Sequence, residues 1–173
     1  SIAALVQKPL TSLMAIKGSG VRGVRDLRGK KVGTAGIPYQ KAYLRAILRQ
    51  AGIPASEVEQ VDVGFNLVPA MLSKRVDATL GAFWNYEGTE LQRRKRDPTI
   101  IRLEEVGVPT YDELVLVASE ETVRERGPLV RRLIQGLARG HERLREDPRS
   151  GIDPLLQANR DLERGLQTAV VDK

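Results

Sequence analysis

The sequence predicts an α/β protein: a parallel-rich β-sheet covered by helices, with a helical C-terminal part. Between Lys31 and Leu103, short apolar runs typical of strands alternate with amphipathic helical segments, and this order favours a parallel sheet. From Glu120 onward, apolar residues recur at helical spacing instead. All seven aromatic residues lie between Tyr39 and Tyr111, so the two parts also differ in composition.

Seven strands and several helices can be placed in order by periodicity and by glycine or proline at their ends. Expected strands cover residues 3–6, 13–16, 31–35, 61–63, 77–83, 100–103 and 113–118. The first two are either separate strands or one strand bent at Pro9. Expected helices cover residues 39–50, 67–73 and 87–96, with a helical turn at 26–29 and further helices after Glu120.

Composition limits the possible functions. A chain of 173 residues has room for one domain or two small lobes. No apolar run approaches the ~20 residues of a membrane helix. Without cysteine the chain forms no disulfide or thiolate metal site. The single histidine, His141, lies in a charged helical stretch, and we expect it to face solvent rather than to bind a metal or serve in a triad.

The net charge of +6 raises the possibility of nucleic-acid binding. Basic residues are mostly interleaved with acidic ones, as in residues 139–149. The only dense basic run, Arg93–Arg96, contains no aromatic residue and is typical of a solvated helix end. We therefore expect no specific binding to DNA or RNA.

Aromatic and polar residues gather where the predicted strands end. In parallel sheets ligands bind at the carboxyl ends of strands, here residues 36–39, 64–66 and 83–87. Six of the seven aromatic residues lie at or just after these ends or in the loop around Tyr111. A role confined to the core would also place rings in the C-terminal helices, so we favour a ligand cleft.

Each candidate residue also has a purely structural interpretation. Phe83 and Trp84 would lie in the core, Asn85 would cap a helix, and Glu87 would lie at the positive end of the helix dipole. Further structural roles are a staple residue for Tyr39, a helix cap for Asn66 and a surface ring for Tyr111. Glu113 opens an apolar strand, so we expect its carboxylate to be paired or to point into a cleft.

Several stretches together resemble the periplasmic-type substrate-binding proteins of ABC transporters, type II fold. They are Asp26-Leu27-Arg28-Gly29-Lys30-Lys31-Val32-Gly33, Gly36-Ile37-Pro38-Tyr39, residues 63–70, Arg75-Val76-Asp77-Ala78, Phe83-Trp84-Asn85-Tyr86-Glu87-Gly88 and residues 107–113. Within that family the chain is most similar to the branch of hydroxymethylpyrimidine (thiamine-precursor) synthases and sulfonate binders. The sequences Trp84-Asn85-Tyr86-Glu87 and Pro109-Thr110-Tyr111-Asp112-Glu113 look like those of the pyrimidine-precursor binders.

The resemblance implies two lobes. Residues 11–101 would form lobe two, and residues 1–10 and 102–173 would supply hinge strands and C-terminal helices of lobe one. The opening of lobe one has no counterpart in this chain, so we expect the chain to expose apolar faces and to self-associate. A closing motion would occur at two crossovers, near residues 8–12 and 103–111.

The resemblance further implies a periplasmic or extracytoplasmic, membrane-associated solute receptor, with an ABC permease as partner and a small molecule as ligand. The implied ligand-binding residues are Tyr39, Asn66, Trp84, Asn85, Tyr86, Glu87 and Tyr111. No catalytic residue, metal or cofactor is expected. A regulatory domain that responds to a ligand, and a small enzyme of the same fold that makes a pyrimidine precursor, are the alternative classes.

The residues favour a flat nitrogen heterocycle over an anion as the ligand. The aromatic rings offer stacking faces, and Glu87 would accept hydrogen bonds from a ring amine. No Arg or Lys lies within the three strand-end segments, whereas a sulfonate receptor would need basic residues there. Riboflavin-type and sulfonate or taurine ligands remain the alternatives within the family.

Overall fold

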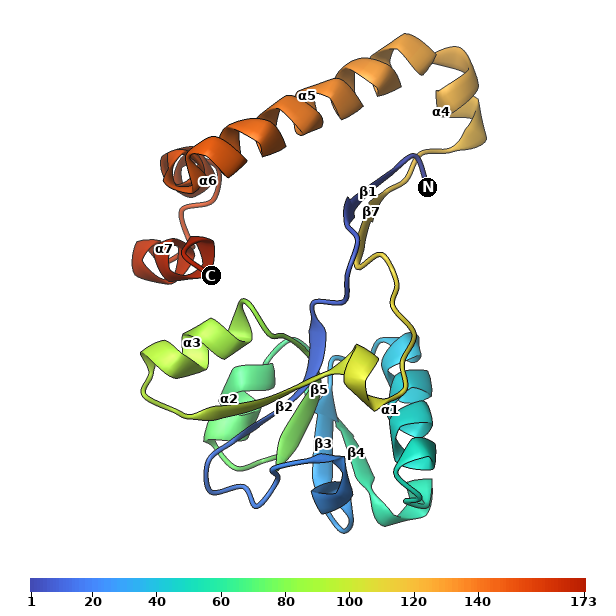
Figure 1. Cartoon of the computed structure of the whole chain (residues 1–173), viewed down its shortest axis with the longest axis vertical. Helices are drawn as coiled ribbons and strands as arrows, with labels where there is room; N and C mark the ends of the chain where they lie inside the picture. The colour runs from blue at the N-terminus through green and yellow to red at the C-terminus, as the bar shows by residue number, and fades with distance from the viewer. The chain divides into compact units, whose positions relative to one another are not determined.

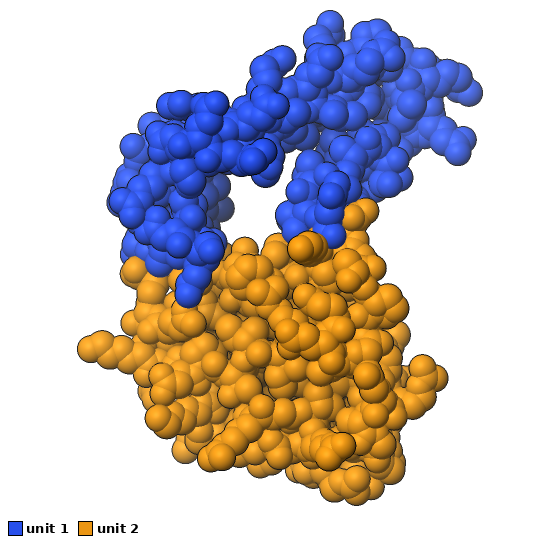
Figure 2. Space-filling view, in the orientation of Figure 1, with its two compact units in different colours: residues 1–7, 114–173 blue, residues 8–113 orange.

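The computed structural model describes all 173 residues, which form two compact units. One unit contains residues 8–113, and the other contains residues 1–7 and 114–173 (Figure 2). The chain therefore enters and leaves the first unit through two neighbouring crossovers, at Gln7–Lys8 and at Glu113–Leu114.

The unit of residues 8–113 is built on a five-stranded sheet in the order β4-β3-β5-β2-β6. Its strands are β2 (Thr11–Ile16), β3 (Lys31–Thr34), β4 (Glu59–Asp62), β5 (Ala78–Phe83) and β6 (Pro98–Arg102). Strand β3 pairs in parallel with β4 and β5, whereas β2 is antiparallel to both β5 and β6. Four of the five strands consequently end at the same edge of the sheet.

Helices cover both faces of this sheet (Figure 1). Helix α1 (Pro38–Gln50) packs on one face, where Leu44, Ile47 and Leu48 are buried. The short helices α2 (Leu67–Leu72) and α3 (Glu87–Arg93) supply buried side chains to the core on the other face. Single 3-10 turns lie at Val24–Leu27, Ala55–Glu57 and Leu103–Val106. The result is a three-layer α/β unit.

Strand β2 lies inside the sheet and is buried along almost its whole length. Leu13 and Ala15 belong to the core beside α1, and Met14 belongs to the core beside α2 and α3. This alternation follows from the two-residue period of a strand. At the start of the strand, Thr11 and Ser12 are fully buried polar residues, and the Ser12 hydroxyl donates to the Ala82 carbonyl at 2.8 Å.

A β-bulge at Gly81 interrupts β5 shortly before the strand ends. Ser12 pairs with Ala82 and Leu13 with Leu80, so Gly81 is the unpaired extra residue. Its φ of 128° is accessible to glycine, and a Cβ at this position would overlap the side-chain nitrogen of Gln40. Gln40 is buried, and its Oε1 accepts a hydrogen bond from the Ala35 N–H at 2.9 Å. The bulge shifts the inward and outward alternation of the residues that follow it, including Phe83.

The second unit combines a two-stranded antiparallel sheet with helices. Strand β1 (Ala3–Val6) pairs with β7 (Leu114–Leu116). The helices are α4 (Glu120–Glu125), α5 (Gly127–Glu146), α6 (Ile152–Ala158) and α7 (Arg164–Val171), with a 3-10 turn at Pro148–Gly151. Within this unit, residues of β1 and α5 line an apolar hollow of about 940 Å³. None of the helices has both the length and the apolar character required to cross a membrane.

Most predicted elements are confirmed, and His141 is exposed as expected. The segments around Pro9 form two strands rather than one bent strand. Strand β4 covers Glu59–Asp62, earlier than the predicted residues 61–63, because its pairing with β3 starts at Glu59. The predicted parallel sheet carries one antiparallel strand, β2, which precedes the β-α-β pattern and inserts between β5 and β6.

Replacing Gly81 with alanine should destabilise the unit of residues 8–113. The substitution strains the backbone at positive φ and forces Gln40 out of its buried position, so we expect a loss of ~2–4 kcal/mol in the free energy of unfolding. Urea denaturation followed by Trp84 fluorescence measures it. Gly23→Ala is the matched control, because a Cβ there meets nothing within 4 Å and its backbone is extended. Equal stability of the two variants would contradict the role given to the bulge.

Candidate functional site

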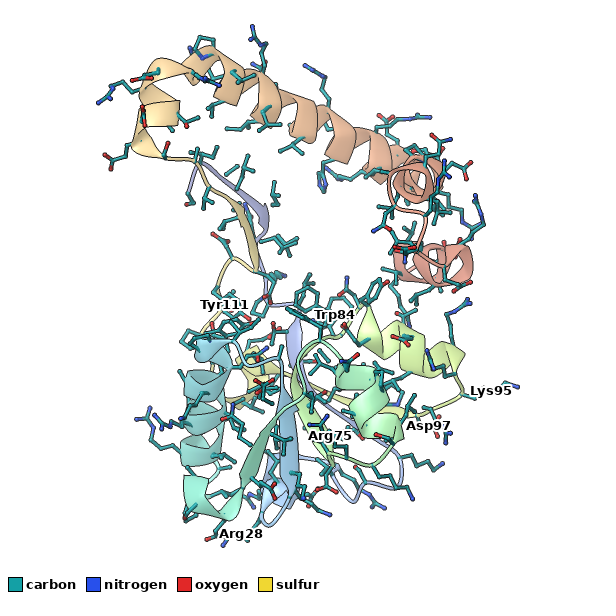
Figure 3. All side chains as sticks on the ribbon, turned by 180° about the vertical axis from the view of Figure 1, so that it is seen from behind. Arg28, Arg75, Trp84, Lys95, Asp97 and Tyr111 are labelled. Atoms are coloured by element: carbon teal, nitrogen blue, oxygen red, sulfur yellow. The ribbon has the colours of Figure 1, made fainter.

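The candidate site lies at the edge of the sheet where β3, β4, β5 and β6 end and β2 begins. Thr11, the first residue of β2, pairs with Phe83, the last residue of β5. Figure 3 shows Trp84 and Tyr111 at this end of the unit of residues 8–113, and Arg28, which precedes β3, at the opposite end. Strand ends and the returning segment Tyr111–Glu113 therefore supply the side chains of the edge.

Three tyrosines form a row of rings on one side of this edge. Tyr39 lies in the first turn of α1, one helical turn before Tyr43, and their ring centroids are 5.1 Å apart in an edge-to-face arrangement. The Tyr43 and Tyr111 centroids are 5.5 Å apart. Tyr39 is 36% exposed, whereas Tyr43 and Tyr111 pack against the core beside α1. The structure thus joins two predicted residues, Tyr39 and Tyr111, through a third ring.

The carboxylate of Glu113 connects Tyr111 to the start of β2. Its Oε2 accepts the backbone N–H groups of Leu10 and Thr11, each at 2.8 Å, and the Tyr111 hydroxyl at 3.0 Å. Its Oε1 accepts the Thr11 hydroxyl at 3.1 Å. Burial raises the pKa of the Tyr111 phenol, and the neighbouring carboxylate raises it further. The phenol therefore stays protonated and remains a donor. The expectation that Glu113 is paired is confirmed.

Trp84 holds the same crossover from the other side. Its backbone N–H donates to the Leu10 carbonyl at 2.9 Å, and its indole N–H donates to the Pro9 carbonyl at 3.3 Å. The guanidinium carbon of Arg102 lies 3.7 Å from the centroid of the indole ring. One face of Trp84 is consequently covered by a cation and is not available for stacking on a ligand.

Glu87 is partly buried at the start of α3. Its Oε2 accepts the backbone N–H of Phe83 at 2.7 Å and so closes the turn between β5 and α3. Desolvation by burial raises the pKa of this carboxyl, while the backbone N–H groups of Phe83 and Glu87 act in the opposite direction. The expected position at the positive end of the helix dipole is confirmed.

The remaining predicted residues differ in their placement. Tyr86, rather than the expected Asn85, is the N-cap residue of α3, because the helix begins one residue later than a cap at Asn85 would require. The Asn85 side-chain oxygen is buried without a hydrogen-bond partner. Asn66 occupies the expected N-cap position of α2, but its side chain is exposed and makes no capping hydrogen bond. No hydrogen bond joins Asn66 to the tyrosine row.

Sequence reasoning missed three residues of the edge: Thr11, Tyr43 and Arg102. Thr11 and Arg102 are brought in by β2 and β6, whose pairing in the sheet cannot be read from local pattern. Tyr43 lies four residues after Tyr39 on the predicted helix, and this spacing places two rings on one face. That signal was available in the sequence.

Surface hollows of this unit lie beside the aromatic edge rather than at its centre. One hollow of about 460 Å³ lies next to α1, where its wall includes Gly36, Pro38, Lys41 and Asp62. None of the four tyrosines lines it. Nowhere do three or more His, Asp or Glu side chains gather closely enough to hold a metal ion.

Comparison with known proteins identifies the class. Residues 1–150 match the family described as "NMT1/THI5 like", and the chain belongs to this family. A formylaminopyrimidine-binding protein of Halalkalibacterium halodurans is 33% identical over 156 residues, covering 90% of this chain and 47% of the relative. A Haemophilus influenzae protein assigned provisionally to thiamine biosynthesis is 36% identical over 125 residues, covering 72% of this chain and 40% of the relative. The chain thus spans less than half the length of these relatives.

Similarity to solved structures establishes the fold of the chain. The periplasmic aliphatic sulphonate binding protein SsuA of Escherichia coli superposes with a TM-score of 0.73 at 15% sequence identity, covering 96% of this chain and 55% of that protein. The fold is therefore that of the periplasmic binding proteins. Among more distant relatives is a 4-amino-5-hydroxymethyl-2-methylpyrimidine phosphate synthase of Legionella pneumophila, 27% identical over 169 residues, covering 96% of this chain and 52% of the relative.

Replacing Glu113 with glutamine should loosen the crossover at Leu10 and Thr11. An amide cannot accept all four hydrogen bonds, and bonds to a charged acceptor contribute ~1.5–3 kcal/mol each. We expect the amide protons of Leu10 and Thr11 to exchange with deuterium at least about tenfold faster, as measured by NMR. Glu59→Gln, which removes a surface ion pair with Lys31, should leave these rates unchanged. Unaltered exchange in Glu113→Gln would disprove the role given to the Glu113 carboxylate in holding Leu10 and Thr11.

Replacing Glu87 with glutamine should change how stability depends on pH. A carboxyl whose pKa is raised on folding binds protons more readily in the native state, so its contribution to the free energy of unfolding falls as pH rises above its ordinary value of 4.5. The variant lacks this effect. Denaturation from about pH 4 to about pH 7 should therefore show the variant gaining stability relative to the wild type. A constant or opposite difference would argue against desolvation of Glu87.

Proposed function

We propose that the protein is the solute-binding component of an ABC import system and captures a small planar nitrogen heterocycle, of the kind from which the pyrimidine of thiamine is made. The observation that carries this proposal is the row of tyrosine rings with the Glu113 carboxylate beside it, at the same edge of the sheet that carries Glu87 after the end of β5. Membership of the family and the pyrimidine named for one relative support it.

The proposed residues would make different kinds of contact with the ligand. Tyr39 and Tyr111 would offer ring surfaces, since flat heterocycles stack on aromatic side chains. Glu87, which keeps acceptor capacity beyond its bond to Phe83, would accept a hydrogen bond from a ring amine. Trp84 would act by holding the crossover that frames the site. Asn66, Asn85 and Tyr86 complete the proposed set, with the amides reading the edge of the ring.

We propose an extracytoplasmic location, with association to the membrane through an ABC permease. The unit of residues 8–113 would serve as the second lobe of the receptor, and closure around ligand would involve the two crossovers. Hinge motions of this kind concentrate in a few residues between rigid parts. Glu113 and Trp84 hydrogen-bond residues 9–11, so the backbone change would be absorbed closer to Gln7 and Leu114.

A biosynthetic enzyme of the same fold is the alternative, because more distant relatives are named as pyrimidine phosphate synthases. Mass spectrometry of the purified protein incubated with an aminopyrimidine tests for turnover: conversion of the compound would favour an enzyme over a receptor.

Calorimetric titration tests the receptor assignment. We expect the protein to bind 4-amino-5-hydroxymethyl-2-methylpyrimidine more tightly than taurine, and Glu87→Gln to weaken this binding about tenfold or more, because a charge-assisted hydrogen bond contributes ~1.5–3 kcal/mol. Glu90→Gln is the matched control on the same helix, since the Glu90 carboxylate pairs with Arg94. Tighter binding of taurine than of the pyrimidine would reject the proposal.

A further inference from the structure

Arg102 is the one basic side chain that the fold brings onto the indole ring of Trp84. It ends β6 and pairs with Ser12, in the strand between β6 and β5. Its guanidinium carbon lies 3.7 Å from the centroid of the Trp84 ring. This separation is well within the range of a cation–π contact, with the guanidinium over the face of the ring.

The guanidinium of Arg102 has no acidic partner, and it differs from the other arginines without one in lying over an aromatic ring. Arg28, Arg94, Arg149 and Arg164 each pair with a carboxylate at 2.7–2.8 Å. Arg102 forms no ion pair, although it is half-buried. The carboxylates of the edge are engaged elsewhere, Glu113 by Thr11, Leu10 and Tyr111 and Glu87 by Phe83.

Stacking on a ring fixes the plane of a guanidinium but uses none of its N–H groups. An arginine presents five N–H donors in a fixed fork, which suits two oxygen atoms of one acceptor. A stacked and unpaired arginine is therefore a preorganised donor, and the ring beneath it limits the directions from which an acceptor can approach.

We propose that Arg102 determines ligand specificity by binding an acceptor oxygen on a substituent of the heterocycle. The substituent is a carboxylate, a phosphate ester or a neutral carbonyl, which share this chemistry. This inference rests on the proposed function. The sequence showed no Arg or Lys within the three strand-end segments, but the fold brings Arg102 to the same edge from β6. The favoured ligand is thus a flat nitrogen heterocycle with an oxygen-bearing arm rather than a bare ring.

Three aminopyrimidines that share one ring test the inference by calorimetry. They carry a methyl, a carboxymethyl or a formylaminomethyl group at the same ring position. Arg102→Met removes the donors while keeping a long side chain over Trp84, and Arg102→Lys keeps the charge without the fork. Arg96→Met is the matched control, because Arg96 is exposed and precedes β6 at the opposite end of that strand.

We expect Arg102→Met to weaken binding of at least one oxygen-bearing compound about tenfold or more, and binding of the methyl compound less than about threefold. Loss confined to the carboxymethyl compound, and recovered in part by Arg102→Lys, identifies an anionic group. Loss confined to the formylaminomethyl compound identifies a neutral carbonyl. Arg96→Met should bind all three like the wild type.

Equal losses for all three compounds, with a lowered melting temperature, would show that Arg102 only supports the fold, and unchanged affinities would reject it as a binding group. In both cases the receptor function stands, because the wild type still binds the ring. A wild type that binds none of the three compounds would reject the proposed function and this inference together.

Discussion

The carboxylate of Glu113 holds the point where the chain enters the unit of residues 8–113 against the point where it leaves. Four hydrogen bonds converge on it from Leu10, Thr11 and Tyr111, and two of these donors are backbone N–H groups that would otherwise lack partners at the start of β2. Trp84 secures the carbonyl groups of Pro9 and Leu10 in the same crossover. Because these contacts tie residues 9–11 and 111–113 to the sheet, the tyrosine row and the end of β5 share one frame. A site assembled from separate loops gains its geometry from such a frame.

The bulge at Gly81 is the second constraint on this edge. An uninterrupted β5 would keep Ala82 on the same side as Leu80, yet the two residues belong to cores on opposite faces of the sheet. The extra residue reverses the alternation just before Phe83 and Trp84, and Gln40 occupies the space that a Cβ at Gly81 would need. The same glutamine binds the Ala35 N–H at the end of β3. The buried amide of Gln40 in α1 therefore contacts both the end of β3 and the bulge in β5.

Local pattern was sufficient for the parts of the fold that depend on neighbouring residues. Period-two apolar runs and helix stop signals predicted the strands and helices of residues 31–103, and clustering of rings at strand ends predicted the edge that carries Tyr39, Trp84 and Tyr111. The odd placement of Glu113 before an apolar strand predicted a paired carboxylate. Long-range pairing was not predictable in this way. Arg102 reaches Trp84 because β6 is placed beside β2 in the sheet. The N-cap of α3 depends on the hydrogen bond from the Phe83 N–H to the Glu87 carboxylate.

The structure also separates two roles that the aromatic residues shared in the sequence. Trp84 has its indole N–H bound to Pro9 and one face covered by Arg102, so it holds the crossover, and that face is closed to a ligand ring. Tyr39, by contrast, is the most exposed ring of a row in which Tyr43 and Tyr111 are partly buried against the core. Since rigid, partly exposed rings lose little conformational freedom on binding, stacking selectivity should reside with the tyrosines. Under the proposed function, Arg102 would bind the substituent, so the ring and its arm would be recognised by different side chains.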